Sequence, residues 1–169
     1  MGRRAALTLH GQYERGILRL QTGESEMTRQ RAPMGFRIVA IVLVLWGLAG
    51  VVACIQQLRL GAEAMGPADD YARRLYAGLP VWYNGVYAVA TVTGLAAGIA
   101  LLLRQRVART LFVVSLVAII VQFGWLFATT DLIAVRGAAA VVPFPVFIAA
   151  VAMFGVWLSD HARRRGWIG

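Results

Sequence analysis

The sequence predicts an all-α integral membrane protein: a four-helix bundle with its N- and C-termini cytoplasmic and a short amphipathic helix in the first external loop. The first observation behind this is composition, since 59% of the 169 residues are hydrophobic, 15% are charged, and the mean hydropathy is +0.66. Soluble domains average about 45–50% apolar and about 25% charged residues. The second is a set of four long apolar runs, and the third is the placement of arginine between them.

Each apolar run is long enough to cross a bilayer, because a helix needs about 20 residues to span about 30 Å of hydrocarbon. No charged residue interrupts the runs, which cover residues 38–58, 79–103, 110–129 and 141–158. Pro143 and Pro145 stand at the start of the last run, where proline is tolerated because the first amides of a helix have no partner within it. We therefore expect a transmembrane domain over 36–160 and a basic cytoplasmic tail over 161–169.

Arginine placement predicts the orientation, because cytoplasmic loops carry an excess of Lys and Arg. All 17 basic residues are Arg, and they sit in short clusters beside the runs, which favours a role in topology over nucleic-acid binding. The connections over 59–78 and 130–140 are formally neutral, whereas the other connection and both ends are basic. We expect anionic lipid at that basic, cytoplasmic face. The topology-setting residues are Arg29, Arg31, Arg37, Arg104, Arg106, Arg109, Arg163, Arg164 and Arg165.

Residues 1–35 form a polar cytoplasmic segment without an apolar period, which predicts disorder. Met27 is an alternative start of translation, because the Thr-Arg-Gln-Arg that follows it is an ordinary basic lead into a first span. A short surface helix from Gln12 to Leu20 is an equal alternative.

The first external connection, residues 59–78, predicts a short helix. Pro67 suits a first helical position, Asp69 and Asp70 suit the positive N-terminal end, and Arg73 and Arg74 suit the C-terminal end. Such a helix would rest on the membrane surface as an anchor or cover the mouth of the bundle as a lid.

Polar side chains within the spans gather towards the external ends. A polar group in hydrocarbon needs a partner or a purpose, so two interpretations stay open. One is a shallow pocket open to the outside, and the other is a set of interhelical hydrogen bonds worth about 0.6 kcal/mol each. The candidate outer-leaflet cluster consists of Gln56, Tyr83, Asn84, Tyr87, Gln122 and Trp125.

Ala90, Gly94 and Gly98 form a ridge of small residues along one helix face. Such ridges allow two helix backbones to approach closely. The ridge predicts either packing within the bundle or the seam of a homodimer.

The sequence holds no constellation typical of an enzyme, a cofactor site or a metal site. Asp131 and Asp160 are predicted on opposite sides of the membrane, and His10 and His161 lie outside the spans. Cys54 is the single cysteine, so no thiol pair can form within the chain. Haem within the membrane would need axial ligands in the spans, where there is no histidine. Proton-coupled drug export would need a carboxylate within a span, and the four runs contain none.

Val51-Val52-Ala53-Cys54 matches a bacterial lipoprotein cleavage box. Processing at Cys54 would leave a lipid anchor and three spans. The alternative is an intact first span in which Cys54 packs against neighbouring helices.

Several short motifs between roughly residues 38 and 158 resemble one family. They are Leu79-Pro80-Val81-Trp82, Gly94 to Gly98, Leu101-Leu102-Leu103-Arg104 and Ser115-Leu116. The pattern resembles small, uncharacterised four-helix bacterial inner-membrane proteins, some of which are labelled "sugar transporter". The resemblance implies a bacterial inner membrane as the location. Known three-helix sugar carriers use a Pro-Gln pair within the membrane, and this chain has no Pro-Gln.

These observations predict a non-catalytic membrane protein without a cofactor, acting as an accessory subunit, scaffold or envelope component. It would work as a homodimer or within a larger membrane complex. The alternative function is a small carrier for a neutral solute, which would have to dimerise because four helices hardly enclose a path alone.

Overall fold

The computed structural model describes residues 32–168 of the protein, and within that range it contains helices and no strand. Several features of the sequence analysis lie outside the described residues: Met27, Arg29, Arg31 and the alternative surface helix over 12–20. The elements, in chain order, are α2 (Met34–Leu60), the 3₁₀ helix η1 (Gly61–Met65), α3 (Asp70–Ala77), α4 (Val81–Leu102), α5 (Ala108–Thr129), α6 (Leu132–Arg136), α7 (Ala138–Val141) and α8 (Pro143–Arg164).

Among residues 32–168, four helical segments are long and apolar enough to cross a membrane. They are Met34–Ala64, Val81–Leu102, Ala108–Thr129 and Ala138–Arg164. This is the helix set of a multi-pass membrane protein, and it confirms the predicted all-helical fold with four apolar spans.

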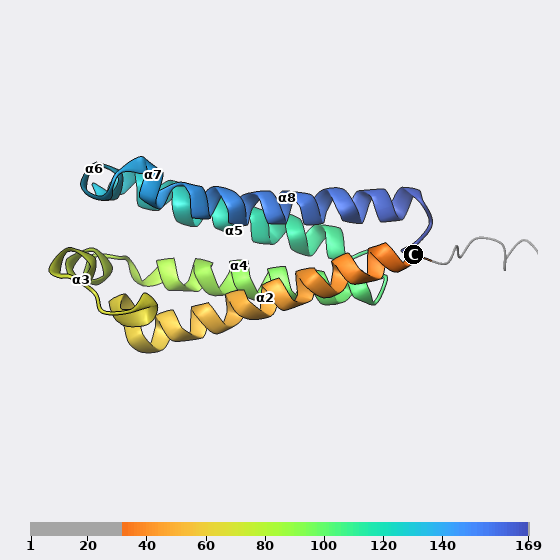
Figure 1. The fold of residues 1–169 in the computed structure, drawn as a ribbon, viewed down its shortest axis with the longest axis horizontal. Helices are drawn as coiled ribbons and strands as arrows, with labels where there is room; N and C mark the ends of the chain where they lie inside the picture. The colour runs from red at the N-terminus through yellow and green to blue at the C-terminus, as the bar shows by residue number, and fades with distance from the viewer. Residues whose placement is uncertain (1–31, 169) are drawn as a thin grey trace, which may run out of the picture.

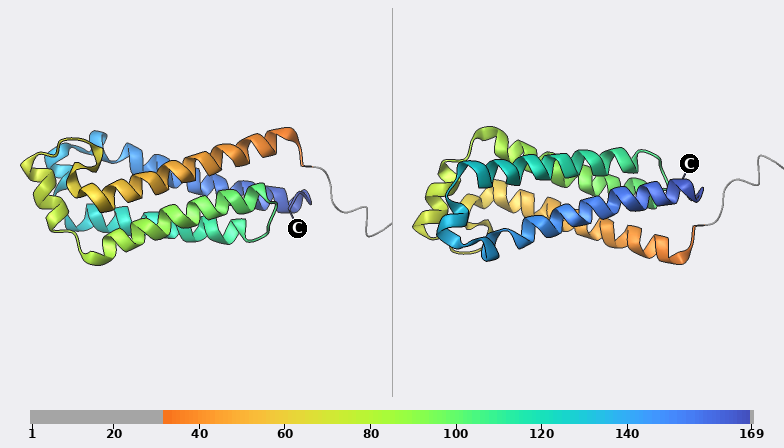
Figure 2. Two further views of the ribbon diagram at one scale, coloured as in Figure 1. Left: turned by 90° about the horizontal axis from the view of Figure 1, so that it is seen from below. Right: turned by 90° about the horizontal axis from the view of Figure 1, so that it is seen from above.

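The long helices pack in a series, in which α2 lies on α4, α4 on α5, and α5 on α8 (Figures 1 and 2). η1, α3, α6 and α7 gather at one end of the bundle, which we call the cap end. The start of α2, the α4–α5 connection and the end of α8 lie at the other, which we call the basic end. Both ends of the described chain are therefore on the same side, and the Phe36 and Trp167 rings meet there with centroids 5.6 Å apart.

The larger apolar core occupies the basic end. Its residues come from the start of α2, the end of α4, the start of α5 and the end of α8. The buried members are Phe36, Ala40, Leu43, Ala97, Ala100, Leu101, Ala108, Phe112, Leu158, Ala162 and Ile168. A smaller cluster of Ala90, Ala118, Ile119 and Ala152 continues it along the bundle.

The segment predicted as a basic tail over 161–169 is folded against the bundle over its described residues, 161–168. Helix α8 continues to Arg164, and Gly166 then adopts a left-handed conformation with φ of 67°. This reversal lets the Trp167 amide donate to the Ala162 carbonyl at 2.9 Å, and Ile168 is buried in the core. The reason is chemical: the stretch carries two apolar side chains after its arginines, and a glycine at the helix end lets the chain turn back.

Candidate functional site

Helix α3 is organised by charged residues of its own loop. The Asp69 carboxylate caps the helix by accepting a hydrogen bond from the Ala72 amide at 2.9 Å. Glu63 of η1 accepts from the Ala68 amide at 2.7 Å and from Arg73 Nε at 2.9 Å. Backbone amides and the Arg73 side chain thus hold the loop in its folded conformation.

Four side chains join this loop to the α5–α8 connection, and we call them the loop clasp: Asp69, Tyr71, Asp131 and Arg136. Arg136 forms an ion pair with Asp69, and its guanidinium lies 5.4 Å from the centre of the Tyr71 ring. The Tyr71 hydroxyl donates to Asp131 Oδ1 at 2.7 Å. The clasp thus holds together two segments that are far apart in the sequence.

The clasp changes the proton affinity of two of its members. The Ala72 amide, followed by Arg136, holds the pKa of the Asp69 carboxyl below its ordinary value. The hydrogen bond to Asp131 raises the pKa of the Tyr71 phenol, so the donating proton is retained at neutral pH. Both shifts favour a closed clasp near pH 7.

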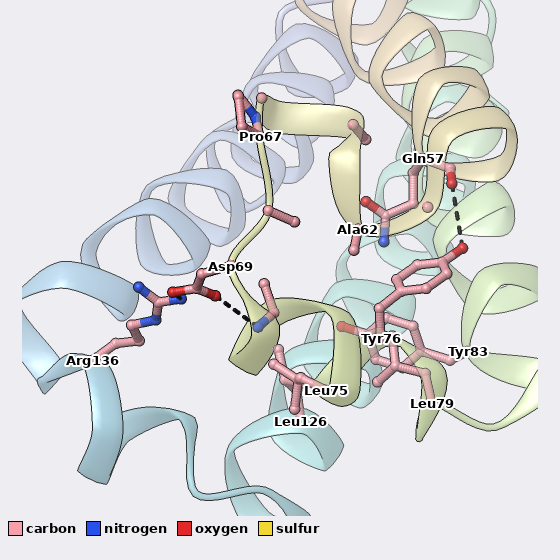
Figure 3. Close-up of a pocket in the computed structure, with 15 residues that line it drawn as sticks. Gln57, Ala62, Pro67, Asp69, Leu75, Tyr76, Leu79, Tyr83, Leu126 and Arg136 are labelled. Carbon is pink, nitrogen blue, oxygen red and sulfur yellow. Dashed lines mark hydrogen bonds and ion pairs between the residues drawn. The ribbon is translucent and has the colours of Figure 1, made fainter.

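A pocket of about 420 Å³ lies under the folded loop (Figure 3). Its walls come from the end of α2, from η1 and the connection to α3, and from α3 itself. Leu79, α4, α5 and the clasp complete them. Its lining includes Gln57, Ala62, Asp69, Leu75, Tyr76, Leu79, Tyr83, Leu126 and Arg136.

A short chain of hydrogen bonds runs through the Tyr76 hydroxyl on the pocket wall. This hydroxyl donates to the Gln57 backbone carbonyl at 3.3 Å and accepts from Asn84 Nδ2 at 3.3 Å. The other amide atom of Asn84, Oδ1, is buried and has no hydrogen-bond partner among the described residues. The Gln57 side-chain amide points towards the pocket (Figure 3).

The structure brings three of the six predicted cluster residues together. Tyr83 is buried and lines the pocket, Gln122 is buried beside its hydroxyl, and the Trp125 ring lies 5.8 Å from the Tyr83 ring. Asn84 reaches the pocket wall only through Tyr76. Tyr87 is half-buried one turn further along α4.

Gln56 stands apart from this group, because its side chain is exposed on α2. Its neighbour Gln57 lines the pocket instead, together with Tyr76 of α3. Sequence reasoning missed both, although the helical register separates Gln56 from Gln57 by about 100° and predicts that only one of them can face the bundle.

The ridge of small residues on α4 packs against two other helices, α5 and α2. The Ala90 carbonyl accepts a 2.7 Å hydrogen bond from Ser115 of α5, and a Cβ on Gly94 would lie 3.1 Å from the same hydroxyl. Gly98 faces α2, where a Cβ would lie 3.1 Å from the Val44 nitrogen. Packing inside the bundle therefore uses all three positions.

Several other hydroxyls along the spans donate to backbone carbonyls of their own helices. Thr91 donates to the Tyr87 carbonyl at 3.1 Å, and Thr93 donates to the Val89 carbonyl at 2.6 Å. Ser159, near the basic end, donates to the Gly155 carbonyl at 2.7 Å. These hydroxyls are satisfied within their own helices.

The basic end is tied together by arginines. Arg109 at the start of α5 forms a 2.8 Å ion pair with Asp160 near the end of α8. Arg104 Nε donates to the Trp167 carbonyl at 2.6 Å, which fixes the reversed C-terminal residues to the α4–α5 connection. Arg106, Arg163, Arg164 and Arg165 are exposed.

In the part of the chain that the structure describes, no group of three or more His, Cys, Asp or Glu side chains is placed to hold a metal ion. Comparison with protein-family models, with curated proteins and with solved structures gave no match. The class of the protein is therefore defined by its own fold. It is a multi-pass helical membrane protein with a pocket beneath η1, α3, α6 and α7, which we call the loop cap.

Proposed function

We propose that the protein is a non-catalytic accessory or scaffold component of a bacterial inner membrane. The observation that carries this proposal is the distribution of polar groups. The hydroxyls of Thr91, Thr93 and Ser115 bind backbone carbonyls, and the basic end is filled by apolar side chains. A bundle packed in this way supports association and shape rather than passage or chemistry.

In the proposed orientation the basic end, with both chain termini, is cytoplasmic and the cap end is external. The exposed arginines of the α4–α5 connection and of the α8 end support this, because arginine favours the cytoplasmic side. The same arginines would contact anionic lipid. Helix α3 would then be the short external helix, with its aromatic side chains at the interface.

The test is purification of the full-length protein after cross-linking in the membrane. We expect a stoichiometric membrane partner or a homodimer. Recovery of an uncross-linked monomer at every cross-linker concentration would contradict the proposal. Single-position cross-linkers at the lipid-facing Val92 and Val117 would identify the helix face involved, because both are exposed.

The pocket favours a second candidate, a small homodimeric carrier for a neutral solute. A carrier has to expose a site to both sides, and the packed core of the basic end would have to open for this. Flux of uncharged solutes into liposomes containing the purified protein separates the two functions. Flux that saturates with solute concentration favours the carrier, and flux equal to that of empty liposomes favours the scaffold.

Processing at Cys54 is the further alternative. Helix α2 runs without a break from Met34 to Leu60, and Cys54 is buried within it, which supports an intact first span. The intact mass of the mature protein tests this. A mass that includes residues before Cys54 and lacks an attached lipid is expected.

A further inference from the structure

We propose that the pocket under the loop clasp binds a small uncharged molecule that has a carboxamide-like head and an apolar body. This site goes beyond the scaffold function, which requires no ligand. It shares only Tyr83 with the cluster suggested by the sequence, and its polar wall is formed by Gln57 and Tyr76 (Figure 3).

The size and position of the pocket support a ligand site. Its volume of about 420 Å³ lies within the range of about 300–1,000 Å³ that is usual for small-molecule sites. Leu75, Leu79 and Leu126 supply an apolar surface, and the Tyr76 and Tyr83 rings add aromatic faces. Residues between 57 and 83, together with Leu126 and Arg136, build it, so the ligand would be held by segments that are distant in the sequence.

One amide side chain without a partner gives the pocket wall its chemistry. The Gln57 side chain has no hydrogen bond to any described residue, although it lines the pocket and points towards it (Figure 3). Behind the wall, Asn84 Oδ1 is buried without a partner and is linked to Tyr76 through its own Nδ2. Asn84 does not line the pocket, whereas the half-buried Gln57 amide does, so a ligand amide could pair with Gln57 without breaking a hydrogen bond of the protein.

The charges around the pocket decide against an ionic ligand. Asp69 and Arg136 are paired with each other at the rim, and Glu63 is paired with Arg73. An anion or a cation would have to break one of these pairs to gain a partner. A carboxamide matches Gln57 better, because each amide offers one donor and one acceptor group to the other.

The experiment compares two nearly isosteric probes, 4-fluorobenzamide and 4-fluorobenzoate, by fluorine NMR line broadening with the full-length protein in detergent. We expect binding of the amide and at least about tenfold weaker binding of the carboxylate, because the latter is charged and cannot donate. Empty micelles measure the partitioning of both probes. Equal binding of the two probes, or amide broadening no greater than in empty micelles, would overturn the proposal.

Two variants locate the site, and a neighbouring residue supplies the control. Gln57→Leu removes the free amide, and Ala62→Leu fills the pocket without removing a hydrogen-bonding side chain. Both should lower the affinity for the amide about tenfold or more. Gln56→Leu should bind like the unchanged protein, since Gln56 is exposed outside the pocket. Full affinity in the Ala62→Leu variant would refute the assigned site even if Gln57→Leu failed to fold.

Discussion

At the scale of single residues, the close approach of α2 to α4 depends on Gly47. A Cβ built on Gly47 of α2 would lie 2.7 Å from the Leu95 Cα of α4, a distance that real side chains do not show. The obstacle is backbone, so no rotamer change can relieve it. Gly47 therefore determines how near α2 can come to α4, as Gly98 does from the other side.

The Gly47→Ala variant should destabilise the bundle by about 1–3 kcal/mol, the usual cost of overpacking. Unfolding in mixed micelles, followed by tryptophan fluorescence, measures this free energy. Gly124→Ala is the matched control on α5, because a Cβ there would meet nothing within 4 Å. Equal stability of the two variants would show that α2 and α4 do not cross as described.

Gln56 and Gln57 show how far single residues can be predicted from the sequence. The sequence predicts two amides near the end of the first span, and the structure turns only Gln57 into the pocket. Choosing between them requires the direction of the neighbouring helices, which an apolar run does not encode when both faces of the helix are apolar. Tyr83, Gln122 and Trp125 lie on two helices that meet, and composition and depth were enough to group them.

At the scale of elements, the loop cap acts as one unit. Helix α3 has no buried residue and is held by Asp69 at its start and by the contacts of Asp69 and Tyr71 with the α5–α8 connection. Polar contacts on an exposed surface are individually weak. The cap should therefore loosen before the spans do.

The cap should open at low pH. The folded pKa of Asp69 is lowered, so its contribution to stability is present above its ordinary pKa of about 4 and is lost as the pH falls through the folded value. Spin labels at Ala77 of α3 and Ala139 of α7 would report this in a Cys54→Ala background, since both positions are exposed. The distance distribution should be narrow at pH 7 and broad at pH 3.

Two controls separate clasp opening from general unfolding. Labels at Val92 and Val117, exposed on α4 and α5 and free of titratable neighbours in sequence, should give the same distances at both pH values. Asp69→Asn should broaden the cap distribution already at pH 7, because it removes the charge that pairs with Arg136. A cap distribution that stays narrow at pH 3 would contradict the role of the clasp.

Helix ends can be predicted where capping residues lie close together in the sequence. Contacts between segments that are far apart in the sequence could not be predicted. Pro67 suggested a helix start, whereas α3 begins at Asp70, and the capping role belongs to Asp69. The link from Tyr71 to Asp131 spans distant parts of the chain, and nothing in either segment alone indicates it. The C-terminal reversal at Gly166 was not predicted either, because Trp167 and Ile168 pack against residues of other helices.

At the scale of the whole molecule, the protein is asymmetric from end to end. The basic end combines an apolar core with exposed arginines, and the cap end combines a pocket with paired acidic and basic groups. In the orientation we propose, the basic end faces the cytoplasm, because cytoplasmic segments of membrane proteins carry an excess of arginine and lysine. The proposed scaffold, the lipid contacts of the arginines and the external access of the pocket all depend on that orientation.

Cysteine accessibility tests the orientation most directly. Single cysteines at Ala77, Ala139 and Gln105, placed in a Cys54→Ala background, lie on exposed positions of α3, α7 and the α4–α5 connection. In intact bacterial cells freed of the outer membrane, a membrane-impermeant maleimide should label Ala77→Cys and Ala139→Cys, and it should label Gln105→Cys only after lysis. Labelling of Gln105→Cys in intact cells, with protection of the two cap positions, would contradict four crossings with both ends in the cytoplasm.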